Sequence, residues 1–336
     1  MSPSPLVWLV VLLVVLPATG LVSAWAYMIQ MPGQSYDGPL LPLSEDEALL
    51  RDRLEGHVRA LAEGIGERNV SRPAALEAAA RYIEDRFEEL GHEVTTLSYE
   101  VDGVRVRNLE VTLPGRTDPA ELVLVGAHYD SAPGTPGAND NASGVAALLE
   151  LAALLGSEPL DRTVRLVAFT NEEPPYFETP EMGSRVYAGA AAARGDRITA
   201  MISLETIGYY SEESDSQSYP VPLNLLYPDR GDFIGFVGNL SSRSLVRRSI
   251  ATFRETTPLP TEGAAVPSGI PGVGWSDHSS FWIHDFPAIM ITDTALFRYP
   301  HYHLPTDTPD QLDYLRMVRV VQGVAEVVRE LASGGA

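Results

Sequence analysis

The chain has 336 residues, of which 45% are hydrophobic and 8% aromatic, so it can bury the core of a sizeable folded domain. Its formal net charge is −21 and all 24 basic residues are arginine, which argues against nucleic acid as a partner. The absence of cysteine excludes disulfide bonds and thiolate metal sites. Any metal site would therefore use histidine nitrogens and carboxylate oxygens.

The N-terminal segment is apolar. No charged residue occurs between Leu6 and Ile29, which is long enough for one membrane-spanning helix. The same stretch resembles a signal peptide, with a short apolar core, a break at Pro17 and small residues up to Ala24. We expect residues 1–29 to be an uncleaved anchor of an exported, membrane-attached protein. The alternative is a secreted or periplasmic protein from which a signal peptide has been cleaved.

A linker and one large domain are predicted after this segment. Residues 30–43 are rich in proline and glycine, which predicts a linker, and residues 44–336 are long enough for one domain. Ser44 and Glu47 have the spacing of a capping box, which predicts a helix from there to about Ala62.

The remaining elements alternate between helical and extended patterns. Pro73 begins a second predicted helix, with apolar residues at every third or fourth position. Two alternating segments joined at Asp102 and Gly103 predict an antiparallel hairpin. Apolar strands and helical segments then alternate up to a last helix from about Pro309 to Leu331. The order predicts an α/β fold with a mixed, mostly parallel central sheet of about eight strands between helical layers.

Polar residues end three of the predicted strands. His128 and Asp130 end one apolar run, Glu172 and Glu173 end the next, and Glu205 ends a third. In open α/β sheets, sites form outside the carboxyl ends of the strands. His128 could bind a metal while Asp130 accepts its other ring N–H. Because consecutive side chains on a strand face opposite sides, we expect one of the paired glutamates to bind metal and the other to act as general base.

Two further residues complete a possible metal-binding set. Asp140 lies in the segment GANDNASG and His303 in HYHLPTDT. Asp140 alone could be only a turn residue and helix cap. Together with the residues at the strand ends, however, they match a two-metal hydrolytic site, in which one carboxylate bridges two zinc ions about 3.5–4 Å apart.

Seven segments in order resemble a known family. They are VGAHYDS, GANDNASGVAALLELA, AFTNEE, MISLETIGYY, WSDHSSFW, FPAIMITDT and PHYHLPTDTPD, and they extend from about Val123 to Asp313. This order is similar to that of the co-catalytic di-zinc aminopeptidases, metallopeptidase family 28. Glutamate carboxypeptidases, the transferrin-receptor ectodomain and glutaminyl cyclases are related to that family. The resemblance implies a zinc exopeptidase-like fold.

The resemblance also implies roles for individual residues. The resemblance implies that the protein binds two Zn²⁺ ions through His128, Asp140, Glu173, Glu205 and His303. His128 and Glu173 are expected to share one ion, Asp140 to bridge, and the remaining two ligands to complete the second site. Glu172 becomes the general base, and Asp130 the partner of His128. The peptide bond after Asp140 is expected to be cis.

The activity implied by the resemblance is that of a zinc-dependent exopeptidase acting on peptides. We expect an aminopeptidase that removes N-terminal residues with a water held between the metals. The alternatives are a glutaminyl cyclase-like acyltransferase on one zinc, a non-catalytic binding ectodomain, and a carboxypeptidase. A carboxypeptidase needs a cation for the terminal carboxylate, and Arg185 or Arg298 could serve.

Two segments near these motifs have less certain roles. PPYFETPEM follows Glu173, and its Tyr176 and Phe177 are expected to form a wall of the substrate side-chain pocket, with a tolerant surface loop as the alternative. Asp277 and His278 could either line that pocket or form a structural pair.

Overall fold

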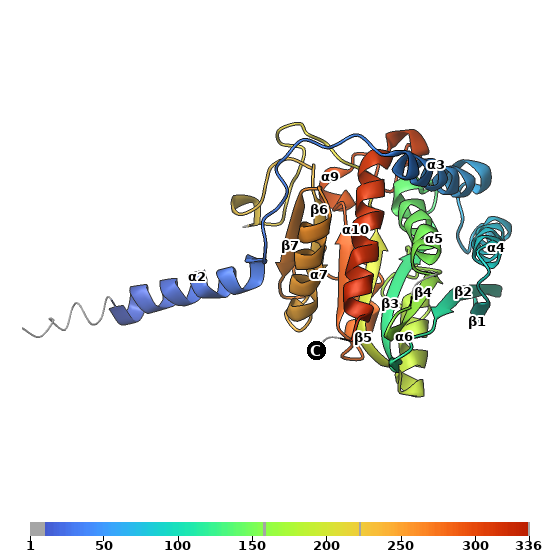
Figure 1. The fold of residues 1–336 in the computed structure, drawn as a ribbon, viewed down its shortest axis with the longest axis horizontal. Helices are drawn as coiled ribbons and strands as arrows, with labels where there is room; N and C mark the ends of the chain where they lie inside the picture. The colour runs from blue at the N-terminus through green and yellow to red at the C-terminus, as the bar shows by residue number, and fades with distance from the viewer. Residues whose placement is uncertain (1–10, 157–158, 222, 335–336) are drawn as a thin grey trace, which may run out of the picture.

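A central sheet of eight strands organises the computed structural model, which describes residues 11–156, 159–221 and 223–334 (Figure 1). The strands are β1 (Val94–Val101), β2 (Val104–Leu113), β3 (Asp118–His128), β4 (Arg162–Phe169), β5 (Arg197–Glu205), β6 (Ile234–Gly238), β7 (Thr261–Ala265) and β8 (Ala288–Thr292). Their spatial order is β1-β2-β4-β3-β5-β8-β6-β7. The pairs β3–β4, β3–β5, β5–β8 and β6–β7 are parallel and the other three antiparallel, which confirms the predicted mixed, mostly parallel sheet.

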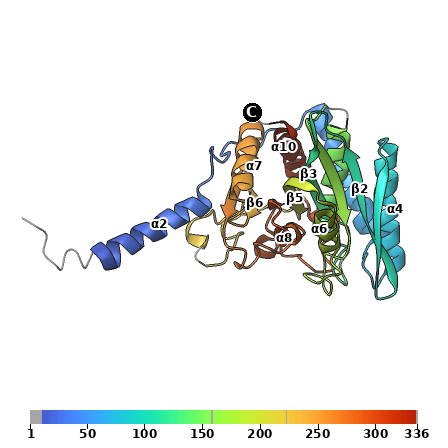
Figure 2. The same ribbon diagram turned by 90° about the horizontal axis from the view of Figure 1, so that it is seen from below.

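Helices cover both faces of this sheet (Figure 2). The helices are α2 (Leu16–Ile29), α3 (Glu45–Arg59), α4 (Pro73–Glu89), α5 (Gly144–Leu155), α6 (Gly183–Arg194), α7 (Arg243–Thr256), α8 (His278–Trp282), α9 (Ala295–Arg298) and α10 (Tyr314–Ala332). Short π-helical segments are η1 (Val11–Val15), η2 (Ala60–Ile65) and η3 (Ala138–Ser143), and 3₁₀ turns are η4 (Leu223–Leu225) and η5 (Pro309–Gln311). One apolar core lies under α3, α4, α5, α7 and α10, and a smaller one lies under α6 and α8.

Local signals in the sequence placed several elements correctly. The backbone N–H of Ser44 donates to Glu47 Oε2 at 2.8 Å and the backbone N–H of Glu47 donates to Ser44 Oγ at 3.3 Å, so the capping box forms. The β1–β2 turn has positive φ at both Asp102 and Gly103. The last helix begins later than expected, because a 3₁₀ turn at Pro309–Gln311 precedes α10.

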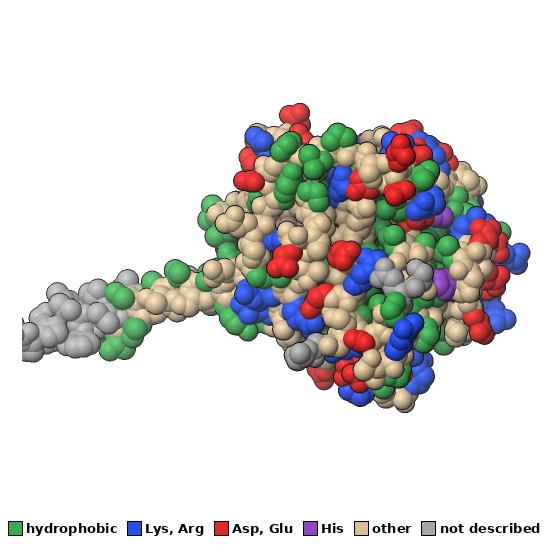
Figure 3. Space-filling view, in the orientation of Figure 1, with side chains coloured by type: hydrophobic (Ala, Val, Ile, Leu, Met, Phe, Trp, Pro, Cys, Tyr) green, Lys and Arg blue, Asp and Glu red, His purple; other side chains and the backbone are tan. Residues whose placement is uncertain are grey.

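The structure describes only part of the N-terminal segment. Within the described residues, α2 and the other helices are too short or too polar to cross a bilayer. The predicted anchor, residues 1–29, includes residues 1–10, which lie outside the described residues. Helix α2 projects away from the domain (Figures 1 and 3), and the linker that follows contacts strand β7, where the backbone N–H of Thr261 donates to Ser35 Oγ at 2.8 Å. On the face seen in Figure 3, acidic and arginine side chains are interspersed.

Candidate metal centre

The predicted site residues meet at the carboxyl edge of the sheet. His128 is the last residue of β3, and Glu205 is the last residue of β5, which lies directly beside β3. Asp140 comes from η3, which leads into α5, and His303 comes from the loop between α9 and η5. Glu173 belongs to the loop after β4. Parallel strands therefore bring together side chains that are 175 positions apart in the chain.

Five of these residues form two groups that share one carboxylate. The groups are His128, Asp140 and Glu205, and Asp140, Glu173 and His303. His128 Nε2 lies 3.3 Å from Asp140 Oδ1 and 3.2 Å from Glu205 Oε2. His303 Nε2 lies 3.1 Å from Asp140 Oδ2 and 3.2 Å from Glu173 Oε2. The two oxygens of Asp140 thus face different histidines, as in a bridging ligand.

This grouping differs from the expected one, in which His128 and Glu173 shared a metal. Strand β5 is the direct neighbour of β3, so Glu205 comes to lie beside His128. Strand β4 ends at Phe169, and the loop beyond it carries Glu173 to the side of His303. Both β4 and β5 are direct neighbours of β3, so the path of the loop after β4 decides the pairing, and the sequence does not reveal that path.

The donor set of each group fits zinc. Nitrogen and oxygen ligands on one tetrahedral zinc lie roughly 3.3 Å apart at the usual bond lengths. The observed separations are 3.1 to 3.3 Å. Several buried atoms of these ligands find no hydrogen-bond partner within the described part of the chain, among them His128 Nε2, Asp140 Oδ1, Glu173 Oε1 and His303 Nε2. Buried polar atoms are normally satisfied, so these atoms are suited to bind an ion.

The electrostatics of the centre also favour cations. Burial, together with the charges of Glu205 and Glu173, raises the pKa of Glu172 well above its usual range. Burial, with the charge of Asp140, raises the pKa of Glu173 to about 8. Burial alone would lower the pKa of His303, but its bonds to Asp140 and Glu173 raise this pKa to about 10. The buried carboxylates thus outnumber the positive charges available from the two histidines.

Glu172 lies beside the two groups and belongs to neither. Its Oε2 is 3.9 Å from His128 Nε2, and the side chain is buried. The sequence predicts that strand alternation directs the Glu172 and Glu173 side chains to opposite sides of a strand. Strand β4 has already ended, however, and the intervening Asn171 has a positive φ of 56°, so a turn aims the two side chains differently.

Asp130 connects His128 to this turn. Its Oδ1 lies 3.5 Å from His128 Nδ1. The same carboxylate accepts the backbone N–H groups of Glu172 and Glu173, each at 3.1 Å. Asp130 therefore orients one histidine and holds both glutamates in place, which is a larger role than the sequence indicated.

Comparisons with known proteins agree with this geometry. Residues 108–328 match the model of peptidase family M28. The uncharacterized protein YfbL of Escherichia coli (strain K12) is 43% identical over 282 residues, which cover 81% of this chain and 86% of YfbL. The chain belongs to peptidase family M28. Leucine aminopeptidase 1 of Arthroderma otae is 28% identical over 66% of the chain, but the match spans only 57% of that relative.

Solved structures of other proteins share the fold. A zinc aminopeptidase from Bacillus subtilis superposes with a TM-score of 0.69 at 16% identity, covering 84% of this chain and 95% of the other. A glutaminyl cyclase from Fimbriiglobus ruber superposes with a TM-score of 0.61 at 21% identity, covering 88% and 97%. At these identities the similarity concerns the fold alone. The expected family and fold class are confirmed.

The cis peptide expected in this M28 chain occurs between Asp140 and Asn141. The Asn141 side chain fixes the loop to the end of β5: its Nδ2 donates to the carbonyl of Leu204 at 2.8 Å and its Oδ1 accepts from the backbone N–H of Thr206 at 3.1 Å. The Asp307 carboxylate accepts the backbone N–H of Asp140 at 3.2 Å. These contacts hold the bridging carboxylate from two sides.

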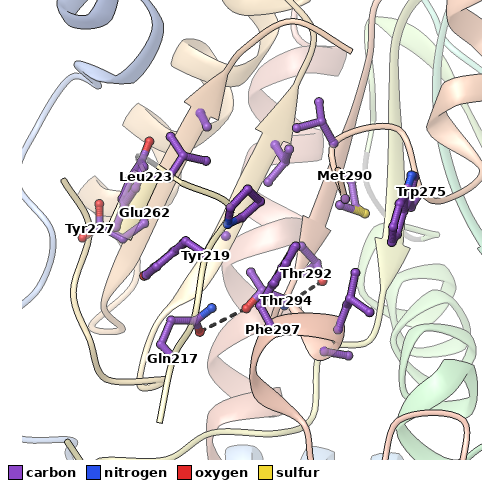
Figure 4. Close-up of a pocket in the computed structure, with 18 of the residues that line it drawn as sticks. Gln217, Tyr219, Leu223, Tyr227, Glu262, Trp275, Met290, Thr292, Thr294 and Phe297 are labelled. Carbon is purple, nitrogen blue, oxygen red and sulfur yellow. Dashed lines mark hydrogen bonds between the residues drawn. The ribbon is translucent and has the colours of Figure 1, made fainter. Parts of the chain in front are cut away.

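A mostly apolar cavity of about 120 Å³ opens beside Glu205 and Tyr302 (Figure 4). None of its lining residues comes from PPYFETPEM, so the structure does not place that segment in this pocket. The segment turns instead towards the β1–β2 hairpin, where the Tyr176 hydroxyl donates to Asp102 Oδ2 at 2.6 Å. Tyr176 therefore has a structural partner at this hairpin.

Of the pair Asp277 and His278, only the histidine side chain has evident structural partners within the described residues. His278 Nε2 bonds to the carbonyl of Val273 at 2.8 Å, and its ring packs edge-on against Trp282. Asp277 is fully buried, burial raises its pKa to about 7, and it does not line the cavity.

The two arginines that could hold a terminal carboxylate have partners of their own. Arg298 Nε donates to Gln217 at 2.7 Å, and Arg185 donates to a backbone carbonyl, so both guanidinium groups are engaged within the protein.

Proposed function

We propose that the chain is an aminopeptidase that uses two zinc ions to remove N-terminal residues from peptides. The observation that carries this proposal is the Asp140 carboxylate, which faces one histidine and one glutamate on each side. The named aminopeptidases among its M28 relatives support the choice of substrate.

The side chains supply the proton transfers. When bound, the zinc ions would polarise the scissile carbonyl and lower the pKa of an attacking water. Glu172, which is bound into neither ligand group, accepts the proton of the attacking water and returns it to the leaving amine. The Asp130 carboxylate lies 3.5 Å from His128 Nδ1, where it can take up the Nδ1 proton in a slightly closer approach and so keep Nε2 directed at the metal.

Two alternatives are less well supported. A glutaminyl cyclase acting on one zinc would not need the second group of ligands, Asp140, Glu173 and His303. A carboxypeptidase needs a free cation for the terminal carboxylate, and Arg185 and Arg298 are both engaged elsewhere.

A panel of amino-acid p-nitroanilides tests the proposal. The purified protein should release nitroaniline from substrates with a free amino group and leave their N-acetylated forms intact. A zinc chelator should abolish the activity, and added zinc should restore it. Equal cleavage of free and acetylated substrates, or cyclisation of N-terminal glutamine as the main reaction, would contradict an aminopeptidase.

We also propose that the apolar segment from Leu6 to Ile29 attaches an exported enzyme to a membrane. Its support is the uncharged sequence together with the projection of α2 away from the domain (Figure 1). Alkaline extraction of membranes from cells that express the full chain should leave the protein in the pellet. A soluble mature protein that begins after Ala24 would show a cleaved signal peptide instead.

A further inference from the structure

The floor of the pocket is one row of residues that crosses four strands. Glu205 on β5 pairs with Thr292 on β8, Thr292 with Gly235 on β6, and Gly235 with Glu262 on β7. Directly paired residues point to the same face of a sheet, and all four residues line the pocket. Three strand spacings separate the ends of the row by about 14 Å. The pocket therefore extends from a metal ligand to a second carboxylate.

Gly235, in the middle of this row, has no side chain that would fill the pocket. A Cβ at Gly235 would lie 3.2 Å from the carbonyl oxygen of Thr292, closer than most such contacts. Apolar side chains border the row, and in Figure 4 Trp275 lies towards one end and Tyr227 and Glu262 towards the other. The space beside the metal centre is thus a long apolar channel with an acidic end.

The acidic end of the channel is the carboxylate of Glu262, which is not paired with another side chain within the described residues. Within the described residues, no hydrogen bond or ion pair engages the half-buried Glu262 carboxylate, and burial raises its pKa. The charge of Arg254 opposes this rise in the pKa of Glu262, but Arg254 forms no ion pair with it in the described part of the chain and donates instead to the carbonyls of Thr261 at 2.6 Å and Pro32 at 3.0 Å. A cation entering the channel would relieve the cost of this desolvated charge.

We propose that this channel receives the side chain of the substrate's N-terminal residue and that Glu262 selects lysine or arginine. The inference rests on the proposed aminopeptidase function. The methylene groups of such a side chain would pack against the apolar walls while its charged end meets the carboxylate.

Lysine and norleucine p-nitroanilides test the role of charge, because their side chains differ only by the ammonium group. The zinc-loaded enzyme should show kcat/KM at least about 10-fold higher for lysine. Glu262→Gln should lower the lysine value by about 10-fold or more and leave norleucine within about 2-fold. Asp232→Asn is the matched control, because Asp232 lies near Glu262 but does not line the pocket, and it should preserve the ratio.

Competitive inhibition by free lysine and free norleucine gives a second readout that does not depend on turnover. The enzyme should bind lysine more tightly than norleucine, and Glu262→Gln should remove that difference. A preference of the unmodified enzyme for norleucine would overturn the inference, as would a Glu262→Gln variant that retains the ratio or loses both substrates equally. If no p-nitroanilide with a free amino group is cleaved, the proposed function itself fails.

Discussion

At the scale of single residues, the centre depends on carboxylates with different surroundings. Asp140 contacts both histidines, Glu173 contacts His303, and Glu172 contacts neither ligand group closely. A carboxylate that contacts a metal is needed for affinity, whereas a free one can gain and lose a proton. Substitution of each should therefore produce a different defect.

Asp140→Asn should weaken both metal sites together. The change keeps the shape of the side chain but removes the charge that faces His128 and His303. We expect close to two zinc equivalents in the unmodified domain and fewer than one in the variant, as measured by elemental analysis after dialysis. A single tightly held metal in the unmodified protein, unchanged by excess zinc, would favour the cyclase class.

Glu172→Gln and Glu173→Gln form a matched pair. Glu172→Gln should retain zinc and folding while kcat falls by roughly 10²–10⁴-fold, the usual contribution of a positioned general base. Glu173→Gln should lose metal affinity and activity together, with partial recovery in added zinc. Kinetics combined with metal analysis distinguishes the two variants. If zinc is lost only from Glu172→Gln, then Glu172 is the metal ligand and Glu173 the general base.

At the scale of elements, one arginine holds the connection between β3 and η3. Arg68 is fully buried, and its guanidinium donates to the carbonyls of Tyr129 at 2.6 Å, Pro136 at 2.5 Å and Gly137 at 2.8 Å. Burial lowers its pKa to about 10, although the carboxylates of Asp307 and Asp130 favour its charge. The loop between His128 and Asp140 thus takes its shape from a residue far earlier in the chain.

Arg68→Lys should destabilise this connection. Lysine keeps the charge but cannot present donors in the planar arrangement of a guanidinium, so several buried carbonyls lose a partner. We expect a loss of about 2–5 kcal/mol in the free energy of unfolding, measured with urea. The exposed Arg72→Lys is the control and should change it by less than about 0.5 kcal/mol. Similar stability of the two variants would refute the role given to Arg68.

At the scale of the whole molecule, metal binding should contribute to stability. The centre joins β3, β5, the loop after β4 and the loop before η5, and its carboxylates repel one another without cations. A ligand present at about 1,000 times its Kd stabilises the folded state by about 4 kcal/mol.

Removal of zinc by a chelator should therefore lower the Tm of the full chain, and zinc should restore it. Differential scanning calorimetry measures the shift. Asp140→Asn should show a smaller shift on chelation, because its sites are already weakened. An equal shift in both proteins would mean that the stabilising metal binds elsewhere.

The sequence by itself determined the features that depend on neighbours along the chain. Strand ends with polar residues, the capping box at Ser44 and the turn at Asp102 and Gly103 are local patterns, and the structure contains each of them. The ordered motifs identified the family and named the seven residues that meet at the centre. Local propensity and motif order were sufficient for this part.

The tertiary structure alone decided which of these residues face one another. Glu205, at the end of β5, lies beside His128, whereas the loop beyond β4 carries Glu173 to His303. The row from Glu205 to Glu262 joins strands that are far apart in sequence, and no local pattern marked it. Strand order and register follow from the packing of the whole sheet against its helices, because that packing fixes contacts between residues that local sequence does not connect.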